Sequence, residues 1–202
     1  MKKLILVSLS LACLIASPVS ATSIEIVDFD AGHTFLNFDE LANGEAITNQ
    51  YAALGALVSG TLGDEGTGAA STVYAYSLGL GTSNPNYIGQ EHNTWDGSVI
   101  FDFFGLNVTQ FGGVIVDSAS NWLSVYDTNN QLIETVLANG TVYDFVGIDT
   151  GSTPIGRAIF SGDFYAIDDV RFNGSPVPEP ATMGLLGLGL AAAGLKRKSR
   201  KA

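Results

Sequence analysis

Lysine and cysteine are both missing from the middle of this 202-residue chain. Residues 22–177 contain neither, and their only basic side chains are Arg157 and Arg171. Against these two arginines stand 19 aspartate and glutamate residues, so this segment has a formal net charge of −17. Proteins bind nucleic acid largely through Lys and Arg contacts to phosphates, so we exclude DNA and RNA as partners. Such an acidic surface favours solubility and divalent cations.

The one cysteine of the chain, Cys13, lies in an N-terminal leader. Removal of this leader would leave a protein without disulfides, thiolate catalysis or cysteine-bound zinc. The sequence around Cys13 also permits a lipoprotein interpretation. However, Ser10 stands three residues before the cysteine, where such sites favour leucine.

Residues 1–21 have the three parts of a secretory signal peptide. Two lysines follow Met1, an apolar run covers residues 4–16, and small residues lead up to Ala21. The apolar run is too short for a retained membrane helix. We therefore predict a signal helix that is cleaved between Ala21 and Thr22.

The C-terminus has three successive parts. Pro178, Glu179 and Pro180 are followed by an uncharged Gly/Leu/Ala segment, 181–195, and then by the basic tail Lys-Arg-Lys-Ser-Arg-Lys. As a helix the segment would be about 22 Å long. It would span a hydrocarbon core of about 30 Å only with thinning of the bilayer or snorkelling of Lys196 and Arg197. The basic tail should stay cytoplasmic, which places the acidic domain outside. A buried helix is the alternative, but its glycines disfavour it.

These three parts resemble the C-terminal signal of the PEP-CTERM family of exported bacterial proteins. The resemblance covers residues 176–202 and implies recognition by an exosortase, a membrane-embedded cysteine protease that cleaves near Pro178-Glu179-Pro180. It also implies a Gram-negative envelope and, often, an organism that makes extracellular polysaccharide. The two prolines keep the motif extended and accessible to a protease. The protein would then be a single-pass membrane protein only until it is processed.

Short β-branched and aromatic runs, separated by turn residues, fill the middle of the chain, and no useful helical stripe occurs there. The clearest hairpin joins 122–127 to 131–137 through Thr128-Asn129-Asn130, because asparagine tolerates the positive φ of tight turns. The glycine-rich stretch 63–68 has two acids and no lysine, so it is a flexible turn and not a phosphate loop. We predict strands at 24–29, 34–41, 55–62, 72–77, 98–104, 112–118, 121–127, 131–137, 141–148, 155–161 and 164–172.

This pattern predicts an all-β fold for residues 22–175, an antiparallel β-sandwich of jelly-roll type. Two stretches, Phe38-Asp39-Glu40-Leu41 with the residues up to Gly55 and Phe164–Phe172, resemble exported PEP-CTERM proteins with a domain like a carbohydrate-binding module. That resemblance implies a fold and no particular ligand.

Calcium is the cofactor that the last predicted strand suggests. Asp168 should share a face with Phe164, Ala166, Val170 and Phe172, and a carboxylate among core residues needs a partner or a cation. If the first and last strands pair, Asp168 or Asp169 could join Asp39 around a calcium ion. Alternatively, Asp168 accepts hydrogen bonds from backbone amides or pairs with Arg157 or Arg171.

The segment 83–97 is predicted to be a long polar loop that could bind carbohydrate. Tyr87, His92 and Trp95 lie among several amides, and sugar sites commonly stack rings on aromatics beside such groups. Alternatively, Trp95 packs against the edge of the sandwich. Either face of the strand that holds Trp122 could belong to the core.

No catalytic pattern is apparent. His33 and His92 are far apart, and neither a Gly-x-Ser-x-Gly elbow nor a His-Glu-x-x-His zinc motif occurs. The acidic stretch 25–30 lacks the second glutamate that a retaining glycoside hydrolase would need. We therefore expect no catalytic residues and no enzyme activity.

The sequence thus predicts an exported protein of the cell envelope, cell surface or extracellular matrix. Its expected role is structural or adhesive, with exosortase and, transiently, the membrane as partners. A calcium-dependent module that binds exopolysaccharide is the main alternative, and a glycoside hydrolase is the remaining one.

Overall fold

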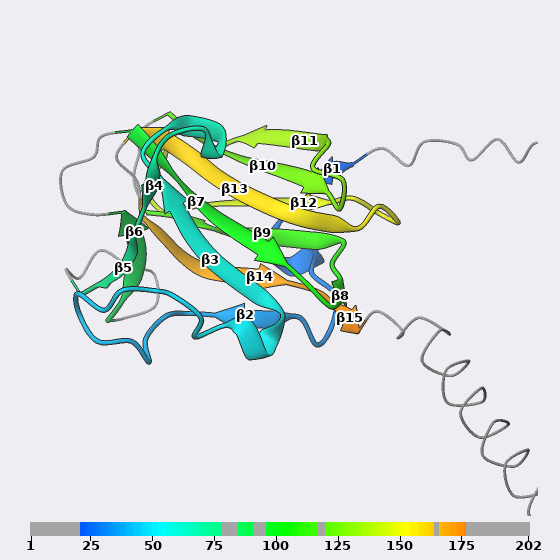
Figure 1. Ribbon diagram of the computed structural model, residues 1–202. Coiled ribbons are helices and arrows are strands. Elements are labelled where there is room, and N and C mark those ends of the chain that lie inside the picture. Colours follow the sequence, from blue (N-terminus) through cyan, green and yellow to red (C-terminus); the bar gives the residue numbers. More distant parts are fainter. Residues whose placement is uncertain (1–20, 78–84, 91–95, 117–119, 164–165, 177–202) are drawn as a thin grey trace, which may run out of the picture.

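The computed structural model describes residues 21–77, 85–90, 96–116, 120–163 and 166–176. Two antiparallel sheets, which we call sheet A and sheet B, pack face to face (Figure 1). Sheet A has the order β1 (Thr22–Ser23), β12 (Asp144–Asp149), β9 (Gln110–Ile115), β14 (Ile167–Phe172), β6 (Tyr87–Gln90), β5 (Val73–Tyr76), with β2 (Thr34–Leu36) pairing β14. Sheet B has the order β11 (Leu132–Leu137), β10 (Asn121–Asp127), β13 (Ile155–Asp163), β7 (Asp96–Phe103), β3 (Ala56–Thr61), β4 (Ala70–Ser71).

A small third sheet pairs β15 (Ser175–Pro176) with β8 (Leu106–Asn107). Three single 3-10 turns complete the described elements: η1 (Ile26–Asp28), η2 (Ala52–Leu54) and η3 (Asp64–Gly66). In the described ranges no helix has the length and apolar character needed to cross a membrane. The predicted signal helix and the predicted membrane helix 181–195 lie outside the described residues.

The core lies between the two sheets and is built by alternation along the strands. In β3, for example, Ala56 and Val58 are buried while Leu57 and Ser59 are exposed. Phenylalanine rings from both sheets meet in the middle: the centroids of Phe101 and Phe111 are 5.2 Å apart, and those of Phe111 and Phe160 are 5.6 Å apart. Burial of large aromatic rings is the main source of stability in such a core.

The predicted hairpin is confirmed. Strands β10 and β11 pair in antiparallel register around residues 128–131, and Asn130 has a φ of +60°. The Asp127 carboxylate accepts hydrogen bonds from the backbone N–H of Asn129 and of Gln131, each at 2.8 Å. The hydrogen bond from Gln131 lowers the pKa of Asp127. Asparagine at positive φ fits this turn as the sequence predicts, and the structure adds the Asp127 carboxylate as a second group that fixes it.

Other predictions need correction. Residues 24–29 form no strand, since the chain there turns through η1, and only Thr34–Leu36 of the predicted strand 34–41 is extended in the sheet. The predicted loop 83–97 contains strand β6, and β7 begins at Asp96. Tyr and Ile begin β6 and give it β propensity, but the neighbouring Gly, Asn and Pro residues hide this signal in the sequence.

Candidate functional site

The outer face of sheet B, turned away from sheet A, carries alternate residues of its central strands. Leu123 and Val125 of β10 point into the core, whereas Trp122, Ser124 and Tyr126 lie on the outer face. The sequence alone left both faces open. The buried pair is the one with the smaller, purely aliphatic side chains.

Turn η3 covers part of this outer face and is anchored there by its backbone. The Glu65 N–H donates to Ser161 Oγ at 3.0 Å, and the Gly66 N–H donates to Ser98 Oγ at 3.1 Å. The two serine hydroxyls are themselves 2.9 Å apart. The predicted flexible turn at 63–68 is therefore bound to β7 and β13.

The Glu65 carboxylate accepts three hydrogen bonds from β10. Trp122 Nε1 donates at 2.5 Å, Ser124 Oγ at 3.2 Å and Tyr126 OH at 2.6 Å. Burial and the hydrogen bond to Glu65 raise the pKa of Tyr126 to about 12. Glu65 has a φ of +53°, which is uncommon for a residue with a side chain. Backbone strain of this kind persists where the surrounding structure imposes it, and it is common at functional sites.

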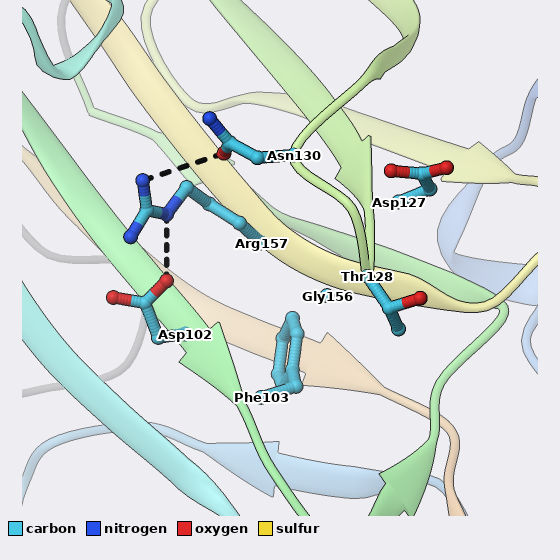
Figure 2. A pocket seen from close by; sticks show the side chains of 7 residues that line it. All are labelled: Asp102, Phe103, Asp127, Thr128, Asn130, Gly156 and Arg157. Atoms are coloured by element: carbon cyan, nitrogen blue, oxygen red, sulfur yellow. Dashed lines mark hydrogen bonds and ion pairs between the residues drawn. The ribbon is translucent and has the colours of Figure 1, made fainter.

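A shallow pocket of about 240 Å³ lies on the same face, where β7 ends and β13 begins, around Arg157 (Figure 2). The Arg157 guanidinium donates to Asp102 Oδ1 at 2.6 Å and to Asn130 Oδ1 at 3.5 Å. Asp102 raises the pKa of Arg157. Tyr126 is the cross-strand neighbour of Arg157, so the pocket and the Glu65 cluster are continuous. The pocket is lined by Asp102, Phe103, Asp127, Thr128, Asn130, Gly156 and Arg157.

This arrangement offers aromatic rings beside carboxylate, amide, hydroxyl and guanidinium groups. Both donors and acceptors are therefore available to a hydroxylated ligand, and Trp122 and Tyr126 are partly exposed. Among the described residues, no three His, Cys, Asp or Glu side chains are grouped so that they could hold a metal ion.

The structure places the predicted calcium residues at the other sheet. Asp168 is fully buried, but a register shift between Asp168 and Arg171, with Asp169 at a φ of +51°, breaks the alternation that the sequence predicted. Because of this bulge, it is Ile167, Val170 and Phe172 that belong to the core.

The hydrogen bonds support the alternative in which Asp168 accepts a backbone amide. Asp168 Oδ1 accepts the backbone N–H of Asp169 at 2.7 Å, while Arg157 pairs with Asp102 instead. Asp39 accepts hydrogen bonds from the backbone of Asn86 and from the side chain of Asn37. The calcium site itself stays a prediction.

The predicted carbohydrate loop is only partly described. Tyr87 lies in β6 with an exposed fraction of 6%, and burial raises its pKa. Its ring therefore offers no open face for a sugar, which corrects the expectation of an exposed platform. His92 and Trp95 lie outside the described residues.

Sequence reasoning did not find Glu65, Asp102 or Arg157 as a group. The sequence offers two modest signals: a glutamate within the glycine-rich stretch 63–68, and one of only two arginines in the acidic segment.

Near the predicted signal cleavage, Ala21 is partly buried against the core, and Thr22 begins β1 opposite Asp149.

Comparison with known proteins gives one informative match. No curated protein matches the chain. Among solved structures, the enzymatically active domain of tailspike protein 4 of bacteriophage CBA120 is similar at 15% identity and a TM-score of 0.35. The similarity covers 67% of this chain and 21% of the tailspike chain, so this protein spans about a fifth of that length. Residues 176–198 match the PEP-CTERM protein-sorting motif, so the chain carries a C-terminal signal for export and sorting.

Proposed function

We propose that this is a non-catalytic protein of the cell envelope or extracellular matrix that an exosortase processes at its C-terminus. The observation that supports this proposal most directly is the sorting motif at 176–198, which starts at the last residue of β15. The motif therefore follows the folded domain without a linker. In this proposal the domain is a jelly-roll sandwich, since β2 near its start pairs with β14 near its end.

Replacement of Pro178, Glu179 and Pro180 by alanine tests this function. We expect the variant chain to stay unprocessed in the membrane fraction of the producing organism. Pro85→Ala changes an exposed proline of the folded domain and is the matched control, which should be processed normally. Normal release of the triple variant would refute exosortase processing at this motif.

The second candidate function is carbohydrate binding on the outer face of sheet B. Its support is the continuous surface formed by Trp122, Tyr126, Arg157 and the pocket around Asp102. Aromatic rings can stack on pyranose faces while the polar groups bind hydroxyls. This surface replaces the buried Tyr87 as the proposed sugar platform.

The two arginines of the domain provide a matched pair of variants. Arg157→Gln removes the guanidinium from the pocket, whereas Arg171→Gln changes the arginine on sheet A, where it stacks on Phe35. We expect saturable binding of the chain to the organism's own exopolysaccharide to be lost only in Arg157→Gln. Equal binding by both variants would contradict the assignment to this face.

Calcium dependence is a separate part of the proposal and rests on the fully buried Asp168 carboxylate. Calcium should raise the melting temperature of the protein and EDTA should lower it. Identical melting in both conditions would refute the calcium site, and the same two conditions in the polysaccharide assay would show whether binding requires the ion.

A further inference from the structure

The chain leaves the folded domain through β15, beside β8 (Figure 1). Pro176 pairs with Leu106, and the Leu106 side chain lies close to both Gly55 and Gly174. The backbone N–H of Phe104 donates to the Gly55 carbonyl at 3.0 Å. Turn η2, the start of β3, strand β8 and β15 thus meet at one end of the sandwich, which we call the β15 end.

Large apolar side chains are exposed at the β15 end. Leu54 is 45% exposed and Phe104 is 47% exposed. The segments that meet at this end, 51–57, 103–108 and 172–176, contain no charged residue. In a domain with 19 acids and two arginines, such an uncharged surface is unlike the rest of the molecule.

An aromatic and a basic side chain flank this surface on sheet A. Phe35 is 45% exposed, and the Arg171 guanidinium lies 4.4 Å from the centroid of its ring. Arg171 of β14 lies four residues before β15, and its cross-strand partner is Phe35 of β2. Segments that lie on a membrane surface carry Phe and Leu on their apolar side and Arg, with its apolar stem, at the boundary.

The length of chain that follows β15 brings this end close to the membrane. Only residues 177–180 separate Pro176 from Ala181, where the uncharged segment begins. Fully extended, the five steps from Pro176 to Ala181 span at most about 17 Å. While segment 181–195 is in the bilayer, the β15 end must therefore lie within the interfacial region or next to it.

We infer that the β15 end, with Leu54, Phe104 and the Phe35–Arg171 pair, is the surface by which the folded domain contacts the lipid interface before processing. This inference rests on the proposed function, because it requires segment 181–195 as a transient anchor. Contact through this uncharged end keeps the acidic remainder of the domain away from anionic lipid. The repulsion between the acidic side chains and the lipid headgroups decays over about 8 Å at physiological salt.

Acids around this end are hydrogen-bonded to neighbouring side chains. Asp30 Oδ2 accepts a hydrogen bond from Asn173 Nδ2 at 3.1 Å, and Asp149 Oδ2 accepts one from Gln110 Nε2 at 2.9 Å. These amides join the N-terminal segment to β9 and to the residues before β15. These two carboxylates are therefore engaged in hydrogen bonds, while Leu54 and Phe104 stay exposed.

The test uses the full chain in lipid vesicles, with Cys13→Ser so that one introduced cysteine carries an environment-sensitive fluorophore. Phe104→Cys places the probe at the β15 end, and Leu190→Cys places it in the predicted anchor. Leu62→Cys is the matched control, since Leu62 is 42% exposed just beyond the opposite end of β3. The vesicles contain phosphatidylethanolamine and phosphatidylglycerol, with nitroxide quenchers in the headgroup region for positions 62 and 104 and along the acyl chains for position 190.

We expect quenching of the probe at 104 to be several times that of the probe at 62, together with quenching at 190. Quenching at 190 without quenching at 104 would overturn the inference and leave the anchor intact; contact with a protein partner instead of lipid would give this result. Equal quenching at 62 and 104 would mean that the domain adsorbs without a preferred surface, which also overturns it. Absence of quenching at 190 would refute the anchor of the proposed function, and the inference with it.

Discussion

The two faces of sheet B are built from the same strands by different chemistry. On the inner face Phe101, Leu123 and Phe160 are fully buried among other apolar groups. On the outer face Ser98 and Ser161 hold the backbone of η3, and the Glu65 carboxylate accepts three hydrogen bonds. Burial of apolar area is non-directional, whereas the outer face depends on hydrogen bonds to one carboxylate. Stability and site geometry should therefore respond to different substitutions.

The largest expected effect is on the inner face. Phe160→Ala removes a fully buried ring that packs against Phe101 and Phe111, and should lower the free energy of unfolding by about 4 kcal/mol. Phe104→Ala, at a ring that is 47% exposed, is the control and should cost far less. Urea unfolding measures both. Similar losses in the two variants would contradict the description of the core.

The positions of the strands of sheet B are predicted well from the sequence, although the sequence did not decide which face of β10 is the inner one. Strand β10 occupies the predicted residues 121–127, and β3, β5 and β7 lie within two residues of the predicted ends. Alternation is a local property, so a sequence shows it directly. It fails at β14, because the bulge at Asp169 adds a residue that only the pairing with β9 reveals.

The next largest effect should come from the carboxylate on the outer face. Glu65→Ala removes the acceptor for Trp122, Ser124 and Tyr126 and should cost about 2 kcal/mol in the free energy of unfolding. We also expect faster amide hydrogen exchange at η3, whose cover over β7 and β13 depends partly on this contact. Unchanged exchange at η3 would show that the two serines alone hold the turn.

A double-mutant cycle sharpens this prediction. Tyr126→Phe removes one of the three donors, and Thr67→Ala, in the same turn but without a bond to β10, is the control partner. We expect Glu65→Ala and Tyr126→Phe to be non-additive, and Thr67→Ala and Tyr126→Phe to be additive. Additivity in the first pair would mean that the Tyr126–Glu65 hydrogen bond contributes nothing.

The outer-face site was not predictable from the sequence. Glu65 lies 57 residues before Trp122, and Asp102 lies 55 residues before Arg157. Their contacts follow from the order β10-β13-β7-β3 in sheet B, which no local pattern specifies. The C-terminal motif was predictable, because all its parts are adjacent in the sequence and match a known signal.

The ion pair at the pocket should contribute less than the Glu65 cluster. Asp102 and Arg157 side chains are 37% and 38% exposed, so solvent screens their interaction. Asp102→Asn should lower the free energy of unfolding by about 0.5 kcal/mol at low salt, and the difference should shrink at about 1 M salt. A salt-independent difference would indicate that packing, and not charge, holds Arg157 in the pocket.

The smallest expected effect is the pH dependence contributed by Tyr126. Its folded pKa of about 12 lies above the value of about 10 for an unperturbed tyrosine. As the pH rises, the unfolded chain loses this proton first. The contribution of Tyr126 to stability is therefore fully present below pH 10 and is lost as the pH rises towards 12. At pH 10 the loss is at most about 0.4 kcal/mol, and solvent screening of a partly exposed ring reduces it further.

The difference between the native chain and Tyr126→Phe isolates this contribution. Tyr51 and Tyr87 also have raised pKa values, so both proteins should lose stability in alkali. The native protein should lose slightly more between pH 8 and pH 10, because it alone retains the Tyr126 phenol. If chemical unfolding gives parallel pH profiles for the two proteins, the phenol of Tyr126 is not held by Glu65 in solution, and the outer face is less ordered than the inner one.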